Sequence, residues 1–312
     1  MCIVTPQVGI DVAKDELVVS INQGKAHAFP NVQTQIASMI RSFPKGAEVH
    51  LEASGGYERL VRQMLEEAGI KVLVHNALKA KRMAQAKGRK AKTDAVDAQG
   101  LSQWGALLPE GSVRCLERQK LADLSRAIHT LKQTAAEYKK RMDMPELDAQ
   151  AVQVFQEIRA DIQKRGQAAE KQLAKRLKEG AFADWYKWLL SVPSIGKVSA
   201  AILVCELPED VVDRSSGQIC SYAGLAPIDD SSGQRTGKAN IGFGNARLKA
   251  CLYMPALNAI KSYEWARQLY AKLRAKGKSH QTAIVAVMRR LLVRAHAVLK
   301  RGSSWQEEPL KA

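Results

Sequence analysis

Residues 8–21 read VGIDVAKDELVVSI, and residues 48–56 read EVHLEASGG. The first stretch holds two apolar strands joined by a polar turn, and the second is a strand that runs into a glycine turn. Between them lie the strand-like run AHAF at 26–29 and a helical pattern at about 33–42, and beyond them come a helix and the strand IKVLV. Three early strands followed by strand–helix alternation predict an α/β domain with a mixed sheet.

The region between about Leu116 and Gly180 shows only helical patterns. Its first half spaces apolar residues alternately by three and four positions, which is the heptad seam of a coiled coil. Met-Pro at 144–145 breaks the pattern, and a second amphipathic helix follows. We expect an antiparallel coiled-coil hairpin whose seam closes either on itself or against a second protomer. The seam residues are Leu121, Leu124, Ile128, Leu131, Ala135, Tyr138 and Met142, then Ala151, Phe155, Ile158, Ile162, Ala169, Leu173 and Leu177.

The rest of the chain is predicted to be mainly helical, from about Ala183 onward. A glycine-rich segment at 223–246 interrupts it, and a helical tail at 261–301 carries eleven basic residues against the one acid Glu264. The basic face of this tail is either a polyanion contact or a solubilising surface. The fold class is therefore α/β plus all-α. The expected domains are 1–112, 113–182 and 183–312.

The formal net charge of +17 and the pI near 9.7 point to a polyanionic partner, because each neutralised phosphate releases condensed counterions. Nucleic acid is the first candidate. A membrane surface is the rival, but no run reaches the roughly 18 apolar residues of a spanning helix. The N-terminal MCIVTPQVGID also lacks the basic-then-apolar order of a signal peptide. We expect a cytoplasmic protein with no membrane partner.

The cysteines give no sign of a structural framework. They are odd in number, widely scattered and never in CxxC spacing, so neither a disulfide set nor a zinc site is indicated. We expect them to be reduced. They are Cys2, Cys115, Cys205, Cys220 and Cys251.

Four carboxylates stand where they could meet. Asp11 directly follows the apolar strand VGI, and Glu52 lies near the end of the strand VHLEAS. Asp94 and Asp97 are three residues apart at a helix start, so both project from one face. If the first and fourth strands are neighbours, the four groups converge. Clustered carboxylate oxygens suit hard divalent cations, and a two-metal phosphoryl-transfer site needs three or four of them.

Each acid also has an ordinary structural explanation. An Asp after a strand is commonly a turn former, and Asp94 favours a helix start. An Asp between two strands also opens the fold of sugar kinases and actin-like ATPases, but those proteins follow it with small residues, whereas here the sequence is Asp-Val-Ala-Lys. The order of the four acids and the elements that carry them favour a metal site.

A basic stretch, ALKAKRMAQAKGRKAKTD, leads to the two aspartates. It has seven cations and no acid before Asp94. Such a run is commonly a solvated surface, but its position before the candidate acids favours contact with a phosphate backbone. The cations are Lys79, Lys81, Arg82, Lys87, Arg89, Lys90 and Lys92.

The stretch LLSVPSIGKVSAAILVCEL predicts two helices around a short turn at Pro193, Ile195 and Gly196. This arrangement resembles a helix-hairpin-helix, in which backbone N–H groups at a glycine turn and a helix start hold a phosphate. One glycine turn between helices is also an ordinary αα-corner. We take Gly196 and Lys197 as candidate nucleic-acid contacts.

Ser232 is the candidate nucleophile of the glycine-rich segment. It precedes Gly233 and is followed by Arg235 and Lys238, so its hydroxyl has a cationic setting in which both cations could contact nucleic acid. Such a hydroxyl attacks phosphorus when a metal or a base activates it. By composition alone, a turn-forming serine is the commoner explanation.

Taken together, the motifs resemble those of the DEDD transposases of insertion sequences, a family that includes the Piv-type DNA invertases. The resemblance covers nearly the whole chain, and its specificity lies in the ordered set rather than in any one motif. The motifs are GIDVAK, LEASGGYE, KTDAVDAQ, LLSVPSIGKVSA, YAGLAP, SSG and GNARLKACLY.

The resemblance implies an N-terminal RNase H-like (RuvC-like) catalytic domain, a helical linker and a C-terminal transposase domain. It places the family's four acids on Asp11, Glu52, Asp94 and Asp97, and its serine nucleophile on Ser232. The family usually has Gln before that serine, where this chain has Ser231, so the two serines remain alternatives. The family also commonly has a basic residue before GNARL, where this chain has Phe243, so a contact from that position is not carried over.

The resemblance also implies the partners and the mechanism. Two Mg²⁺ ions, or Mn²⁺ in their place, would polarise the scissile phosphate, Ser232 would attack it, and a 3′-hydroxyl would be released. The partners would be the DNA of the element ends and target, a noncoding guide RNA, and further copies of the chain in a dimer or tetramer. Such an enzyme would work at the nucleoid.

Three alternatives remain at this point. One is a RuvC-like nuclease that cuts branched DNA by water attack, or a site-specific DNA invertase. A second is a nucleic-acid-binding protein that keeps the fold without catalysis. The third is a kinase of the actin-like fold.

Overall fold

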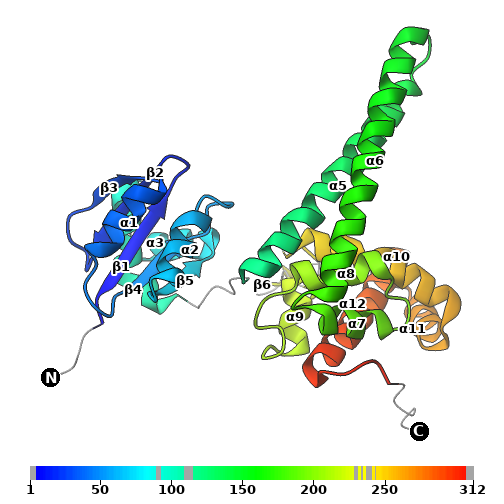
Figure 1. Cartoon of the computed structure of the whole chain (residues 1–312). Coiled ribbons are helices and arrows are strands. Elements are labelled where there is room, and N and C mark those ends of the chain that lie inside the picture. Colours follow the sequence, from blue (N-terminus) through cyan, green and yellow to red (C-terminus); the bar gives the residue numbers. More distant parts are fainter. Residues whose placement is uncertain are drawn as a thin grey trace. The chain divides into compact units, whose positions relative to one another are not determined.

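The computed structural model describes residues 5–88, 93–108, 115–227, 231–232, 235–236, 241–242 and 244–306. The chain divides into two compact units, Met1–Val113 and Arg114–Ala312. Their positions relative to one another are not determined (Figure 1). No helix in the described ranges is long and apolar enough to cross a membrane.

The first unit is built on a five-stranded sheet in the order β3-β2-β1-β4-β5 (Figure 1). Strand β1 pairs antiparallel with β2 and parallel with β4, and β4 pairs parallel with β5. The predicted mixed sheet is confirmed, and the first and fourth strands are neighbours. The strands are β1 (Gln7–Val12), β2 (Glu16–Ile21), β3 (His27–Pro30), β4 (Glu48–Glu52) and β5 (Lys71–His75).

Side chains alternate between the two faces of this sheet, as the period of a strand requires. One face carries Val8 and Ile10 of β1, which lie in a buried core with Ile36 of helix α1 (Gln33–Arg41) and Val61 of helix α2 (Arg59–Glu67). The opposite face of β1 therefore carries Gly9 and Asp11. This second face is the one that positions the candidate acids.

Helix α4 (Asp94–Trp104) lies on this second face, in direct backbone contact with β1. A Cβ atom on Gly9 would overlap the carbonyl oxygen of Ala98 and the backbone nitrogen of Ser102. The Ser102 hydroxyl accepts a hydrogen bond from Gln23 N at 3.0 Å. Glycine at position 9 is thus what lets α4 approach the sheet.

The basic stretch forms a helix that the sequence pattern did not indicate, α3 (Ala77–Ala86). Asn76 caps it by accepting hydrogen bonds from Leu78 N at 3.0 Å and Lys79 N at 3.2 Å. Only Ala80 of this helix is fully buried, against Leu101 and Trp104 of α4. Its apolar stripe is too narrow to stand out among so many cations, which is why periodicity missed it. The 3₁₀ turn η1 (Gly105–Leu107) follows α4.

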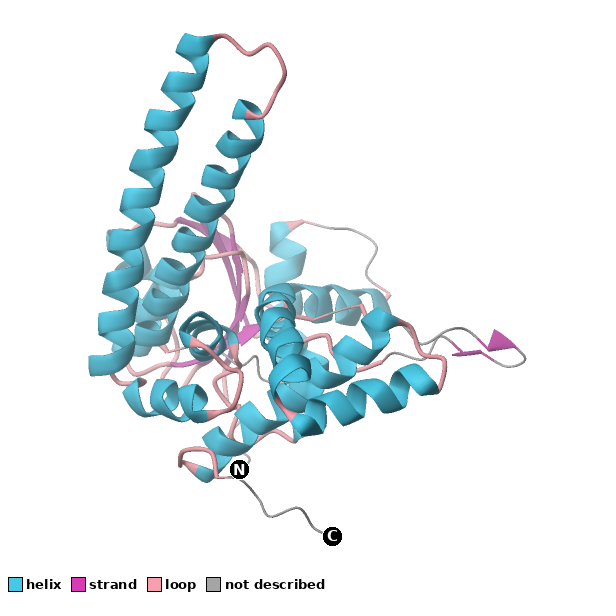
Figure 2. Ribbon diagram, turned by 90° about the vertical axis from the view of Figure 1, so that its right-hand side faces the viewer, coloured by secondary structure: helices cyan, strands magenta, loops and turns pink. Residues whose placement is uncertain are grey.

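The second unit begins with the predicted helical hairpin, formed by α5 (Leu116–Met142) and α6 (Ala149–Glu179). The two helices run side by side in both views, in Figure 1 and in Figure 2. The seam closes on itself in the chain: Tyr138 and Phe155 pack with ring centroids 5.6 Å apart and the ring planes tilted by 49°. Asp148 caps α6 through Gln150 N at 2.9 Å.

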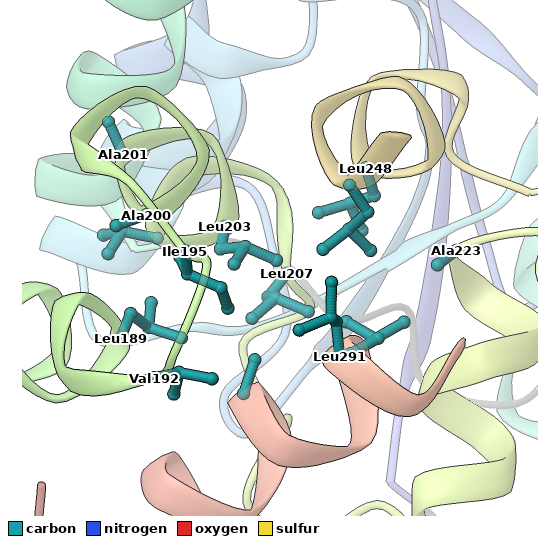
Figure 3. Close-up of a cluster of buried hydrophobic side chains, with 14 of the residues drawn as sticks. Leu189, Val192, Ile195, Ala200, Ala201, Leu203, Leu207, Ala223, Leu248 and Leu291 are labelled. Carbon is teal, nitrogen blue, oxygen red and sulfur yellow. The ribbon is translucent and has the colours of Figure 1, made fainter. Parts of the chain in front are cut away.

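The base of the hairpin and the following helices share one hydrophobic core. Leu203 of α8, Leu207 directly after α8, Leu248 of α10 and Leu291 of α12 point toward one another in it (Figure 3). The helical tail also buries an apolar face in this core, through Ile284, Val287 and Leu292. The elements are α7 (Ala183–Ser191), α8 (Lys197–Glu206), α9 (Ser216–Tyr222), β6 (Ser231–Ser232), β7 (Arg235–Thr236), α10 (Ala246–Ser262), α11 (Glu264–Ala275) and α12 (His280–Arg301).

An ion pair between a buried arginine and a partly exposed glutamate lies at the start of the second unit. Arg118 of α5 is fully buried, and its Nη1 lies 3.0 Å from Glu209 Oε2. Its guanidinium also lies over the rings of Phe182 and Trp185, 5.8 and 5.3 Å from their centroids. The described cysteines, Cys115, Cys205, Cys220 and Cys251, form no disulfide with one another, and Cys2 lies outside the described residues.

Candidate active site

Two of the candidate acids stand side by side at the ends of parallel strands. The register pairs Ile10 of β1 with Leu51 of β4. Asp11 and Glu52 are the next residues of their strands, and both are half-buried. Because alternate residues share a face, both side chains lie on the face that α4 covers.

The other two candidates lie in the first turn of α4. Asp97 directly precedes Ala98, whose carbonyl oxygen would meet a Cβ on Gly9, and Gly9 is two residues before Asp11 on the same face. Asp97 is half-buried and Asp94 is exposed. Thr93 caps the helix by accepting a hydrogen bond from Val96 N at 3.3 Å. The fold therefore brings all four acids to one face of the sheet.

The acids are not drawn together into a finished metal site. Within the described ranges, no three His, Cys, Asp or Glu side chains lie close enough to hold a metal ion. Adjacent carboxylates repel one another when no cation lies between them, so a spread arrangement is the one electrostatics favours. The donor set itself, four carboxylates, is of the type that Mg²⁺ and Mn²⁺ bind.

The turn after Glu52 is held by a residue that sequence reasoning did not single out. The Glu58 carboxylate accepts hydrogen bonds from Ser54 Oγ at 2.8 Å and from Gly56 N at 2.8 Å. Burial raises the pKa of Glu58, but the backbone and Ser54 hydrogen bonds outweigh it, and the net pKa is lowered. Gly55 and Gly56 have positive φ angles of 77° and 127°, which explains the glycine pair.

Asn31 joins the loops that follow the two acid-bearing strands. Its Nδ2 donates to Ala13 O at 3.1 Å and to Tyr57 O at 3.3 Å. Ala13 lies two residues after Asp11, and Tyr57 lies five residues after Glu52. No sequence pattern marked this asparagine, because its role depends on the distance between two loops.

A histidine pair lies beside Glu52. His50 Nδ1 and His75 Nε2 are 3.0 Å apart, the rings stack, and both residues are buried. Burial and the neighbouring His75 lower the pKa of His50 to about 4. His50 is therefore neutral near pH 7, and Gly105 packs directly against its ring. The two histidine rings lie next to Glu52, because Glu52 is the register partner of His75.

The candidate nucleic-acid contacts are partly described. Lys79, Lys81, Arg82 and Lys87 lie along or just after α3, on a part of the helix that is largely solvent-accessible. Arg89, Lys90, Lys92 and Lys238 lie outside the described residues.

The predicted hairpin turn joins α7 and α8. Val192 and Ile195 anchor it in the core, while Gly196 and Lys197 are exposed at the start of α8. Ser194 adopts a positive φ of 71°, and its Oγ accepts a hydrogen bond from Asn258 Nδ2 at 3.4 Å.

Ser232 belongs to the second unit. It pairs with Arg235, and Ser231 with Thr236, in the two-residue strands β6 and β7, which Figure 2 shows in magenta on the loop. The structure thus describes the backbone of both candidate serines.

Comparison with known proteins supports one family. Residues 186–271 match the family described as Transposase IS116/IS110/IS902 family, and residues 8–144 match the transposase family DEDD_Tnp_IS110. The two matches include Asp11, Glu52, Asp94, Asp97 and Ser232.

Individual relatives agree over shorter stretches. The chain is 33% identical over 116 residues to a pilin gene-inverting protein of Moraxella bovis, which is 36% of each chain. It is 29% identical over 119 residues to an uncharacterized 43.6 kDa protein of insertion element IS110 from Streptomyces coelicolor, 38% of this chain and 29% of that one. It is 34% identical over 101 residues to an uncharacterized 44.8 kDa protein of insertion element IS116 from Streptomyces clavuligerus, 32% of this chain and 25% of that one.

These alignments span about a third or less of the length of the curated relatives. The family matches, by contrast, fall on both units in order, one on the acid-bearing sheet and one on the helices around Ser232. Residues 8–144 and 186–271 are therefore similar to two domains of insertion-sequence transposases, the DEDD_Tnp_IS110 domain and the IS116/IS110/IS902 domain.

Proposed function

We propose that this protein is a DNA transposase that cuts and rejoins strands by metal-assisted phosphoryl transfer. The observation that carries the proposal is the register of β1 and β4, which sets Asp11 beside Glu52 on the face that α4 covers with Asp94 and Asp97. An arrangement that only stabilised the fold would gain nothing from four acids on one face.

Divalent metal use is in keeping with the DEDD transposase domain, and we propose two Mg²⁺ ions, with Mn²⁺ able to replace them. Asp11, Glu52, Asp94 and Asp97 would hold them. When bound, such ions polarise a phosphate and stabilise charge on its oxygens. The chain's own contribution is to fix the two strand ends, through Glu58 and Asn31, so that only the first turn of α4 needs to adjust.

Ser232 is the proposed nucleophile. Its Oγ would form a bond to phosphorus while the P–O3′ bond breaks, the hydroxyl proton passing to a carboxylate and the departing oxygen taking up a proton as a free 3′-hydroxyl. The DNA strand would then be held as a phosphoserine. The serine and the acids must act on the same phosphate, within one protomer or between two protomers of a dimer or tetramer.

Nucleic acid would be held through its phosphates. The cations of α3, the start of α8 at Gly196 and Lys197, and Arg235 and Lys238 beside the serine are the proposed contacts. Element ends, target DNA and a noncoding guide RNA are the proposed partners. Work on chromosomal DNA implies a place at the nucleoid.

A site-specific inversion reaction is the second candidate, because one relative is named a pilin gene-inverting protein. Inversion and transposition share the strand chemistry proposed above. They differ in the arrangement of the two DNA sites, which assays with inverted sites on one plasmid and with sites on separate plasmids would distinguish.

The test is covalent capture of DNA. Wild-type protein incubated with Mg²⁺, the element's guide RNA and a radiolabelled donor should give a protein–DNA adduct that survives denaturation, and Ser232→Ala should abolish it. Ser231→Ala is the matched control, because it removes a hydroxyl from the neighbouring residue. Cleavage that persists in Ser232→Ala without any adduct would instead indicate a nuclease that uses water.

A further inference from the structure

The loop that carries Ser231 and Ser232 has a closed base. It leaves α9 at Gly224 and Leu225 and returns at Gly244 and Asn245. Asn245 N donates to Tyr222 O at 2.8 Å across the base, while Leu225 N donates to Cys220 O at 2.8 Å at the end of α9. We call residues 222–225 together with 244–245 the loop stem.

Two glycines make the stem possible. Gly224 and Gly244 have positive φ angles of 70° and 132°. A Cβ on Gly244 would overlap the backbone nitrogen of Gly224. Any other residue at position 244 would therefore force the two sides of the stem apart. The stem is therefore built for close approach of its two sides.

Glu206, the last residue of α8, lies beneath the stem and is only 1% exposed. Its Oε2 accepts a hydrogen bond from Asn245 Nδ2 at 3.1 Å, and its Oε1 accepts one from Arg247 Nη1 at 3.0 Å. Arg126 of α5 adds a third contact, with Nε 3.3 Å from Oε1. One buried carboxylate thus joins three helices to the returning side of the loop.

Asn245 is oriented by its own helix. Its Oδ1 caps α10 by accepting hydrogen bonds from Arg247 N at 3.0 Å and Leu248 N at 3.2 Å. With the oxygen held by the cap, the amide nitrogen must face Glu206. The Asn245 side chain therefore binds both the start of α10 and the Glu206 carboxylate. Only one orientation of its amide group allows both contacts.

Burying the Glu206 carboxylate would be a costly way to gain stability alone. Burying the Glu206 carboxylate carries a desolvation penalty that its partly exposed arginine partners only offset, and well-packed apolar residues often replace buried charged groups without loss of stability. Directional hydrogen bonds, by contrast, fix geometry. The arrangement suits a group that must hold the end of a loop in one place.

We propose that Glu206 and Asn245 are positioning residues that close the loop stem and thereby hold the serine of the loop for attack. This inference rests on the proposed function, since it assigns the pair to the serine chemistry. Neither residue touches the reacting atoms. They act through the stem.

The test reverses the direction of one hydrogen bond. Asn245→Asp keeps the oxygen that caps α10, because Asp caps as well as Asn, but turns a carboxylate toward Glu206. Glu206→Gln alone leaves two arginines facing a neutral amide. The double variant Glu206→Gln/Asn245→Asp restores both the hydrogen bond, with donor and acceptor exchanged, and the wild-type number of charges.

Amide hydrogen exchange measures the stem without any chemistry. In Asn245→Asp we expect the amide of residue 245, which donates across the stem to Tyr222 O, to exchange about tenfold faster or more. The amides of the α12 core should be unchanged, and the double variant should recover protection. Should Asn245→Asp fail to fold, Asn245→Ser, which caps α10 but is too short to reach Glu206, takes its place.

Covalent capture measures the consequence. The rate of adduct formation should fall about tenfold or more in Asn245→Asp and recover in the double variant, with DNA affinity within about twofold of wild type throughout. Unchanged exchange in Asn245→Asp, or faster exchange with an unchanged capture rate, would overturn the inference. A double variant no better than either single one would overturn it too. Absence of any adduct in wild type would instead contradict the proposed function, and the exchange result would still decide whether the pair closes the stem.

Discussion

Replacing Gly9 by alanine should displace helix α4 and the two aspartates it carries. The added Cβ would overlap two backbone atoms, of Ala98 and Ser102, and would lie 2.8 Å from Leu101 Cβ. Backbone atoms cannot rotate away, so the whole helix has to shift. We expect a loss at or above the upper end of the usual overpacking range, about 3 kcal/mol.

That loss corresponds to a fall in Tm of the first unit on the order of 10–20 °C. Differential scanning calorimetry would measure it, with Gly166→Ala as the matched control. A Cβ at Gly166, inside α6, meets nothing within 4 Å, so that variant should gain stability, by about 0.5–1 kcal/mol. A Gly9→Ala protein whose Tm lies within about 2 °C of wild type would refute the close approach of α4 to β1.

The other expectations concern charge and burial. Lys79→Glu should weaken DNA binding and reduce the slope of log affinity against log salt by about one for each phosphate that is no longer neutralised. A slope equal to that of wild type would show that Lys79 of α3 does not contact a DNA phosphate. Arg118→Ala should destabilise the second unit by about 1–3 kcal/mol, because a fully buried side chain and its ion pair with Glu209 are lost. Chemical denaturation measures the loss, and an unchanged midpoint would contradict it. The pKa of His50 is about 4 in the folded state, below its usual 6.5. Between pH 4 and 6.5 the unfolded state therefore binds a proton that the folded state does not bind. Stability should be full above pH 6.5 and fall by up to about 3 kcal/mol as the pH drops to 4, and a His50→Gln variant with an unchanged slope would contradict this.

Much of the acid-bearing sheet could be predicted from the sequence. Strand periodicity located β1, β2 and β4, and the order of elements predicted a mixed sheet. The positions of Asp11 and Glu52 at their strand ends follow from the same pattern. That the two side chains lie next to one another on one face follows from the pairing and register of the two strands, and only the structure supplies these.

The supporting residues could not be predicted, because their roles depend on distances between remote parts of the chain. Asn31 joins two loops. Glu206 accepts hydrogen bonds from Arg126, 80 residues before it, and from Asn245, about 40 residues after it. Arg118 has the pattern of an ordinary surface cation in an amphipathic helix and is fully buried. The expected three-domain division stays a prediction; in the structure the hairpin base and the C-terminal helices share one core.

Metal-dependent covalent capture by an Asp11 variant tests the central claim most directly. Asp11→Asn removes one charge from the proposed metal site, and Asp15→Asn makes the same change in an exposed turn four residues away. With Mg²⁺ and the proposed guide RNA, Asp15→Asn should form the protein–DNA adduct at the wild-type rate, and Asp11→Asn should reduce that rate by about 100-fold or more. Equal rates for the two variants, or an adduct that forms fully in the presence of a chelator, would contradict the account.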